Sequence, residues 1–324
     1  MDDLTTLMRE AVEDVEPTDR RAELRELVAV STKSRHIRYA ITGGLLAAAV
    51  VVTGVAVGVR QSDGPEPEAS TPGRAVDRSR DYRPAYGLYY LGDTPQGRRL
   101  FREFRTGPGP EMTPAAAISL LQAEPDDPDY TTMWPAGTFT DARVEGDVIE
   151  VDVADPSSVG DRLDGMSAAD AALSVDQVIY TVQAAVQSEL PVQFTHQGSP
   201  IAQVLGVSTS EPLAPGAQLD VLALASISDP TERRVVEDSF SANGRASSFE
   251  GDVPWELRDA DDTVVDSGNA QSFGDVDRLY PWATGQIDVS DLEPGEYTFV
   301  VMTADPSGGE GPGSTVDTRT IIIK

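Results

Sequence analysis

The chain has 324 residues, and its 54 Asp and Glu outnumber its 25 Lys and Arg to give a formal net charge of −29. The first 60 residues hold 8 basic and 9 acidic residues, so a net charge of −28 falls on residues 61–324. A surface this acidic repels phosphate backbones, which argues against nucleic-acid binding. The absence of cysteine excludes disulfides, thiolate zinc sites, cysteine nucleophiles and lipid attachment through cysteine.

Residues 1–38 are predicted to form a helical tail on the cytoplasmic side. Apolar residues recur there every three or four positions up to Pro17, and a shorter stripe of the same kind follows. The residues of the two stripes are Leu4, Leu7, Met8, Ala11, Val12 and Val15, then Leu24, Leu27 and Val28. Two such short helices bury little core, so a partner helix or the membrane surface could complete them.

Residues 39–60 are predicted to form one transmembrane helix in contact with the lipid bilayer. Residues 40–59 carry no charge, and 20 such residues are long enough to cross a hydrocarbon layer of roughly 30 Å. The flanking Lys33, Arg35 and Arg38 place the N-terminus in the cytoplasm. A cleaved signal peptide is the competing interpretation, but its leading segment of 39 residues would be unusually long.

Two glycines inside this span, Gly54 and Gly58, form a G-x-x-x-G pair. Such pairs let two helices approach closely, so a homodimer through the span is possible. Residues 61–84 follow as a linker rich in Pro, Gly and charge, and we expect this segment to be disordered.

Residues 85–206 are predicted to form a mixed α/β domain. Two strands are expected at 86–91 and 100–104, and Thr113 with Pro114 begins a short helix. The run at 148–153 alternates apolar and polar residues as a strand does. Ser167 and Asp170 form a capping box before a longer helix, which ends before another strand at Val192 and Phe194.

Residues 218–324 are predicted to form an immunoglobulin-like β-sandwich. The expected strands are separated by turn residues at the spacing typical of such folds. These strands are 219–227, 253–258, 263–266, 286–289, 297–303 and 318–323. Tyr297, which follows Leu292-Glu-Pro-Gly-Glu, resembles the tyrosine corner of these sandwiches. The overall fold class is therefore α+β, with helices at the N-terminus and a sandwich at the C-terminus.

Several short motifs resemble two domain families named for spore germination. The GerMN-like motifs are Tyr89-Tyr-Leu-Gly-Asp93, Arg99-Leu-Phe-Arg-Glu-Phe104, Trp134-Pro-Ala-Gly-Thr138, Glu145-Gly-Asp-Val148 and Asp176-Gln-Val-Ile-Tyr-Thr181. The motifs similar to Gmad2 immunoglobulin-like domains are Gly244-Arg-Ala246, Phe249-Glu-Gly251, Trp255, Gly268 and Pro294-Gly-Glu-Tyr297. The resemblance implies an envelope protein of the kind found in Gram-positive bacteria, actinobacteria included, often linked with sporulation or germination assemblies. It implies no set of catalytic residues.

No catalytic, cofactor-binding or metal-binding residue is assigned from the sequence. His36 flanks the span and His196 stands in a turn-like segment, so neither suggests a Ser-His-Asp arrangement. Asp259-Ala-Asp-Asp-Thr263 lacks the glycine and glutamate that an EF-hand loop needs and is expected to be a hairpin turn, and 126–129 a loop.

Of the three tryptophans, Trp255 is expected in the core, because it lies in a strand. Trp134 and Trp282 stand beside prolines in expected loops and are candidates for exposed rings that stack on sugars.

We therefore expect a single-pass cell-membrane protein that is not an enzyme and needs no cofactor. Its C-terminal domains would lie outside the cytoplasm and bind cell-envelope proteins as a scaffold. One alternative is a signalling protein whose N-terminal helices bind a cytoplasmic regulator such as a sigma factor. Another is a protein that binds or cleaves peptidoglycan.

Overall fold

The computed structural model describes residues 83–304, 311 and 313–324. The predicted cytoplasmic helices, the span at 39–60 with Gly54 and Gly58, and the linker up to residue 82 lie outside these residues. Within the described part, no helix is both long and apolar enough to cross a bilayer.

The first element is a hairpin of β1 (Ala85–Thr94) and β2 (Gly97–Thr106), which is longer and tighter than predicted. Gly97 has a φ of 107°, a backbone conformation that favours glycine in this turn. Side chains on both faces of β1 are buried. Leu88 and Tyr90 enter the core of the α/β domain, while Tyr89 and Leu91 join a second apolar cluster that includes residues of the following domain.

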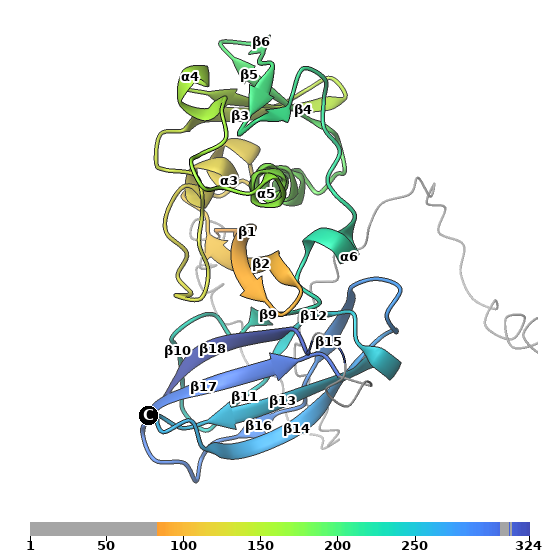
Figure 1. The fold of residues 1–324 in the computed structure, drawn as a ribbon. Helices are drawn as coiled ribbons and strands as arrows, with labels where there is room; N and C mark the ends of the chain where they lie inside the picture. The colour runs from red at the N-terminus through yellow and green to blue at the C-terminus, as the bar shows by residue number, and fades with distance from the viewer. Residues whose placement is uncertain (1–82, 305–310, 312) are drawn as a thin grey trace, which may run out of the picture. The chain divides into compact units, whose positions relative to one another are not determined.

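Two helices cover the face of this hairpin that carries Leu88 and Tyr90. Helix α3 (Pro114–Leu121) begins as predicted, since the Thr113 hydroxyl accepts a hydrogen bond from the Ala116 amide at 3.2 Å. Helix α5 (Ala168–Val186) begins at Ser167, whose hydroxyl accepts from the Asp170 amide at 3.0 Å, which confirms the predicted cap. Figure 1 shows both helices between the hairpin and a four-stranded sheet.

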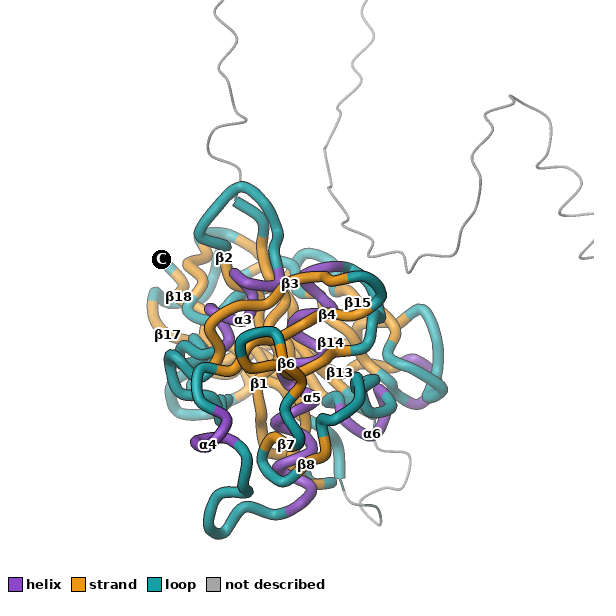
Figure 2. The backbone as a smooth tube through the Cα atoms, turned by 90° about the horizontal axis from the view of Figure 1, so that it is seen from above, coloured by secondary structure: helices purple, strands orange, loops and turns teal. Residues whose placement is uncertain are grey.

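The four-stranded sheet has the order β3-β4-β5-β6. Its strands are β3 (Phe139–Glu145), β4 (Val148–Val153), β5 (Val192–His196) and β6 (Ser199–Pro200). The predicted alternation of β4 is confirmed, with Ile149, Val151 and Val153 buried. Strands β4 and β5 are parallel and are joined through the one-turn helix α4 (Pro156–Val159) and α5. Figure 2 shows the four-stranded sheet from above. A small two-stranded sheet of β7 (Gln203–Val204) and β8 (Val207–Ser208) follows it in the chain.

In the described residues, the second domain has ten strands around one apolar core. The strands are β9 (Ala225–Asp229), β10 (Arg234–Val236), β11 (Ser239–Phe240), β12 (Asn243–Ala246), β13 (Asp252–Arg258), β14 (Val264–Ser272), β15 (Tyr280–Ala283), β16 (Ile287–Asp288), β17 (Gly295–Met302) and β18 (Val316–Ile323). Eight of them form one sheet in the order β10-β18-β17-β13-β14-β15-β12-β9. Because β9 also contacts β17 and β18, the sheet curls over into a sandwich.

The strands predicted at 253–258, 263–266, 286–289, 297–303 and 318–323 are present with shifted ends as β13, β14, β16, β17 and β18, whereas β10, β11, β12 and β15 were not predicted and the start of the sandwich differs. A strand was predicted from Leu219, but Gln218–Val221 form a single helical turn, α6, and β9 begins only at Ala225. The turn forms because the Leu222 amide donates to the Gln218 carbonyl at 2.8 Å. The tyrosine corner is confirmed, since the Tyr297 hydroxyl donates to the Glu293 carbonyl at 2.9 Å.

Candidate functional site

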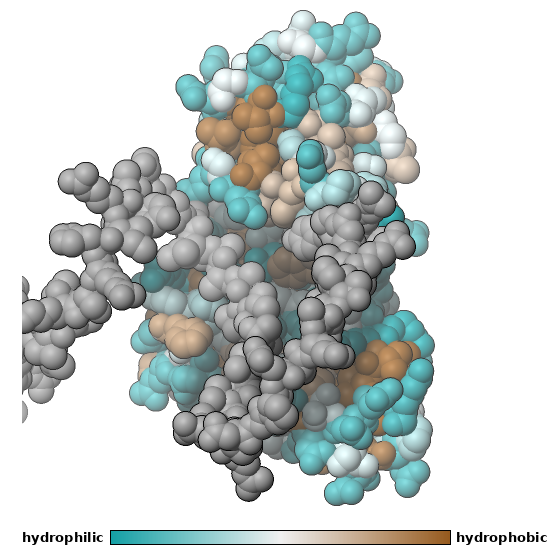
Figure 3. Space-filling view, turned by 180° about the vertical axis from the view of Figure 1, so that it is seen from behind, coloured by the Kyte–Doolittle hydropathy of each residue, from teal (hydrophilic) through white to brown (hydrophobic). Residues whose placement is uncertain are grey.

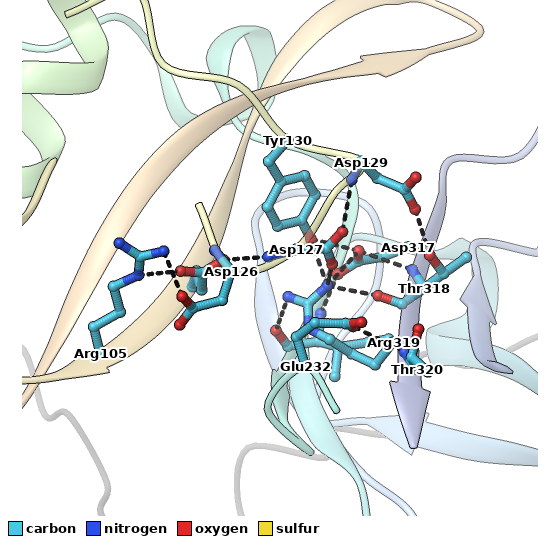
Figure 4. Close-up of polar contacts among 12 residues, drawn as sticks. Arg105, Asp126, Asp127, Asp129, Tyr130, Glu232, Asp317, Thr318, Arg319 and Thr320 are labelled. Atoms are coloured by element: carbon cyan, nitrogen blue, oxygen red, sulfur yellow. Dashed lines mark hydrogen bonds and ion pairs between the residues drawn. The ribbon is translucent and has the colours of Figure 1, made fainter. Parts of the chain in front are cut away.

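The most unusual polar feature of the described residues is a buried charged cluster where the two domains meet (Figure 4). Its centre is β18, in which alternate residues face inward. Ile321 and Ile323 enter the sandwich core, and the same face carries Asp317 and Arg319, both buried. Charged residues are almost never fully buried unless they are paired, so these two need partners.

The α/β domain supplies those partners from the loop between α3 and β3. Asp127 forms an ion pair with Arg319, and the side chains of both are almost fully buried. The Tyr130 hydroxyl accepts from the Arg319 guanidinium at 2.8 Å and donates to the Asp317 carboxylate at 2.5 Å. Asp317 also accepts from the Ile227 amide at 2.6 Å, so β9 joins the same cluster. These contacts tie the two domains together.

A second pair of charged residues holds that loop in position. One carboxylate oxygen of Glu103, on β2, accepts hydrogen bonds from the amides of Asp126 and Asp127, each at 3.0 Å. The other oxygen pairs with Arg105 at 2.6 Å, and Arg105 also pairs with Asp126 at 2.7 Å. Glu103 therefore acts as a positioning residue that presents Asp127 to the sandwich.

Burial governs the proton affinities in the cluster. It raises the pKa of Asp127 to about 7, although the Arg319 guanidinium opposes the shift. It also raises the pKa of Asp317 and that of the Tyr130 hydroxyl. Burial by itself lowers the pKa of Arg319, but Asp317, Tyr130 and Asp127 together outweigh it and hold this pKa above its usual range. Two carboxylates thus share one cation, an arrangement in which one carboxyl can keep a proton near neutral pH.

The sequence-based expectation for two tryptophans is wrong. Trp134 is 2% exposed and Trp282 is 1% exposed, so neither offers a ring to a sugar. The Trp134 indole donates to the Ser174 carbonyl of α5 at 3.1 Å, because its loop folds back onto that helix. Trp282 lies inside β15 and not in a loop. Trp255 is buried in the sandwich core, as predicted.

Of the remaining candidate residues, Asp259–Thr263 lie where the sequence predicts them, whereas His196, expected in a turn, ends a strand. Asp259–Thr263 form the turn between β13 and β14, with the Asp259 carboxylate accepting from the amides of Asp261 and Thr263. His196 is the last residue of β5, and its Nδ1 lies 2.8 Å from the Val153 carbonyl oxygen. His36 lies outside the described residues. Residues 126–129 form a loop as expected, but Asp127 within it is buried, which the sequence pattern does not predict.

One sequence signal could have located the cluster. Asp317 and Arg319 have the same strand phase as Ile321 and Ile323, so period-two alternation places both charges on the core-facing side. No comparable signal exists for Asp127, because its burial depends on contact with Arg319, which is 192 residues away in the sequence.

Comparison with known proteins assigns part of the chain. Residues 224–310 match the family model of Gmad2, the immunoglobulin-like domain of bacterial spore germination. Curated proteins offer no significant sequence match.

Two solved structures are among the matches. One is CopC from Methylosinus trichosporium OB3b, with 14% identity, a TM-score of 0.22, and coverage of 30% of this chain and 91% of that chain. The other is the tandem GerMN domains of the sporulation protein GerM from Bacillus subtilis. It has 15% identity and a TM-score of 0.32, and the alignment covers 64% of this chain and 63% of that chain. The family model alone identifies residues 224–310, a minor part of the chain, as a Gmad2-type immunoglobulin-like domain.

Proposed function

We propose that the chain is a single-pass membrane protein that displays its α/β domain and its Gmad2-type domain outside the cytoplasm. There the two domains bind other cell-envelope proteins, as part of a sporulation or germination type of assembly. The uncharged run at 40–59 with basic residues before it supports the anchor, and the domain family supports the process.

The observation that carries the binding role is a group of exposed apolar residues on two loops of the sandwich. Phe273 is 81% exposed and Val276 is 54% exposed, both on the loop between β14 and β15. Phe249, also exposed, lies on the neighbouring loop between β12 and β13. We call these three residues the loop patch. One face of the molecule, shown in Figure 3, also carries separate apolar areas among hydrophilic residues.

The loop patch has a fixed backbone. The Ser247 hydroxyl donates to the Val276 carbonyl at 3.1 Å, and the Glu250 amide donates to the Asp275 carboxylate at 3.1 Å. Exposed aromatic side chains held on an ordered backbone suit a protein–protein contact, because little conformational entropy is lost on binding.

Site-specific crosslinking in intact cells tests this role. A photo-reactive phenylalanine is placed at position 273 of the full-length chain, and a control is placed at Val264. Val264 is 45% exposed and stands at the other end of β14, roughly 30 Å away along the strand. We expect discrete crosslinked envelope proteins from position 273 and none from position 264. Equal products from the two positions, or none from either, would count against the loop patch as the binding surface.

A further inference from the structure

A pocket at the domain junction holds two arginines that face no carboxylate. Arg102 on β2 and Arg245 on β12 line it together with Tyr89, Ser226 and apolar side chains such as Leu100 and Leu279. The lining thus comes from both domains. The pocket is distinct from the buried cluster around Arg319, because the Arg319 guanidinium is already paired with Asp127 and Asp317.

Most N–H groups of these two guanidinium groups have no hydrogen-bond acceptor among the described residues. Arg102 donates from Nη2 to the Ser228 hydroxyl at 2.9 Å, but its Nε is buried and has no acceptor within the described part of the chain. The Arg102 guanidinium also lies over the Phe104 ring at 4.7 Å. Arg245 is half-buried and has neither a hydrogen bond nor an ion pair with any described residue.

Such an arrangement is electrostatically unfavourable in the free protein. Burial is the main cause that lowers the pKa of Arg245, and the neighbouring positive charges of Arg102 and Arg278 lower this pKa further. The chain has more than twice as many acidic as basic residues, yet none of its described carboxylates approaches this pair closely enough to form an ion pair. Removing positive charges from water without a counter-charge costs free energy, and a bound anion would offset that cost.

We propose that the pocket binds a carboxylate group of a partner polypeptide between Arg102 and Arg245. A guanidinium presents its N–H groups in a planar fork that fits a carboxylate with two parallel hydrogen bonds, and the half-buried guanidinium of Arg245, which has no partner among the described residues, offers such a fork. The apolar part of the lining favours a single anionic group on an apolar stem, while the net charge of −28 beyond residue 60 disfavours polyanions.

This inference rests on the proposed function, because it names the chemistry of a partner, but its test needs no cell. The full-length protein in a nonionic detergent is titrated with two short acetylated peptides. One has a free C-terminal carboxylate, and the other has a glutamate side chain and an amidated C-terminus. A glutamine version of the second peptide and inorganic phosphate serve as controls, all at constant ionic strength, with binding measured by thermal stabilisation.

We expect at least one carboxylate peptide to raise the melting temperature, and the responding peptide identifies the source of the carboxylate. Arg102→Gln and Arg245→Gln should each weaken that response roughly tenfold or more, because each removes charged hydrogen bonds. Arg258→Gln should leave it unchanged, since Arg258 lies at the β13–β14 turn and pairs with Glu256 and Asp262.

The stability of the variants without peptide separates binding from folding. Arg245→Gln removes an unpaired, partly desolvated cation and should therefore be at least as stable as the wild type in carboxylate-free buffer. The proposal is overturned if neither carboxylate peptide binds, if phosphate or the glutamine peptide binds as well, or if both pocket variants bind undiminished. It is also overturned if Arg245→Gln unfolds more readily, because Arg245 would then be a structural contact. Crosslinking from position 273 can succeed in any of these cases, so failure here is distinguishable from failure of the proposed function.

Discussion

The Tyr130 hydroxyl donates a 2.5 Å hydrogen bond to the carboxylate of Asp317, across 187 residues of sequence and across the domain junction. The same hydroxyl accepts from Arg319, so one tyrosine bridges the buried anion and the buried cation. A buried charged network of this kind specifies how two surfaces fit, because any other fit would leave a charge unpaired. We therefore expect the junction to unfold together with the two domains and not to act as a loose linker.

The first prediction concerns the cation of this cluster. Arg319→Met leaves Asp127 and Asp317 buried without a positive partner, which should cost about 3–5 kcal/mol of unfolding free energy. Denaturant unfolding followed by tryptophan fluorescence reports both domains, since Trp134 lies in one and Trp255 in the other. The matched control is Arg258→Met, whose arginine pairs at an exposed turn and whose loss should cost well under about 1 kcal/mol. Similar losses in both variants would contradict the role of the cluster.

The second prediction concerns pH. Burial raises the pKa of Asp127 to about 7, whereas an unfolded aspartate titrates at about 3.9. Between these values the folded state holds a proton that the unfolded state releases, so this group's contribution to stability is present at low pH and lost as pH rises toward 7. Asp127→Asn keeps the side-chain shape but cannot titrate. The advantage of the wild type over this variant should therefore shrink as pH rises from 4 to 7, by at most about 4 kcal/mol at about 1.4 kcal/mol for each pKa unit.

Unfolding curves of wild type and Asp127→Asn, collected at each pH, measure that difference directly. Asp262→Asn at the exposed β13–β14 turn is the control and should show no comparable trend. A difference that stays constant or grows from pH 4 to 7 would show that Asp127 is not the titrating carboxyl.

Regular elements could be predicted from the sequence because their signals are local. The alternation of 148–153, the cap at Ser167 and the corner at Tyr297 each depend on residues a few positions apart, and each is confirmed. The burial of Asp127 and Trp134 depends on contacts formed only after the domains fold, with Arg319 and with helix α5. The proline beside Trp134 correctly indicates a loop, but it does not tell whether the loop covers the core or faces water. The proline beside Trp282 lies in strand β15, so there it does not indicate a loop at all.

The third prediction concerns the tyrosine corner. Tyr297→Phe removes only the hydroxyl that donates to the Glu293 carbonyl, so the unfolding free energy should fall by roughly 1–3 kcal/mol. The same chemical change at Tyr280, whose hydroxyl lies 3.2 Å from the exposed Asp277 carboxylate, provides the control. Thermal or denaturant unfolding compares the two variants, and equal stabilities would mean that the corner bond contributes nothing.

The fourth prediction concerns membrane topology. If Lys33, Arg35 and Arg38 keep the N-terminus in the cytoplasm, residues 61–324 lie outside. Protease added to intact cells stripped of their wall should then digest this region and leave a short membrane-bound fragment, detected through a tag at the N-terminus. A chain that stays full length in intact cells, yet is digested once the membrane is dissolved, would show the reverse orientation or no export.

The fifth prediction concerns the backbone beside the arginine pocket. At Gly244, in β12, an added Cβ would lie 1.8 Å from the Ser226 carbonyl oxygen of β9, closer than any real contact. This obstacle is backbone, so it cannot rotate away as a side chain would. Gly244→Ala must therefore push β9 and β12 apart, and we expect a loss of about 1–3 kcal/mol or more.

Gly285 supplies the control for that change, because a Cβ there meets nothing within 4 Å and its backbone does not need glycine. Gly285→Ala should leave the unfolding free energy within about 0.5 kcal/mol of the wild type or raise it slightly, since alanine narrows the unfolded ensemble. Because Ser226 and Arg245 both line the pocket, Gly244→Ala should also weaken carboxylate binding, whereas Gly285→Ala should not. If Gly244→Ala is as stable as Gly285→Ala, the close β9–β12 contact at Gly244 is absent from the protein in solution.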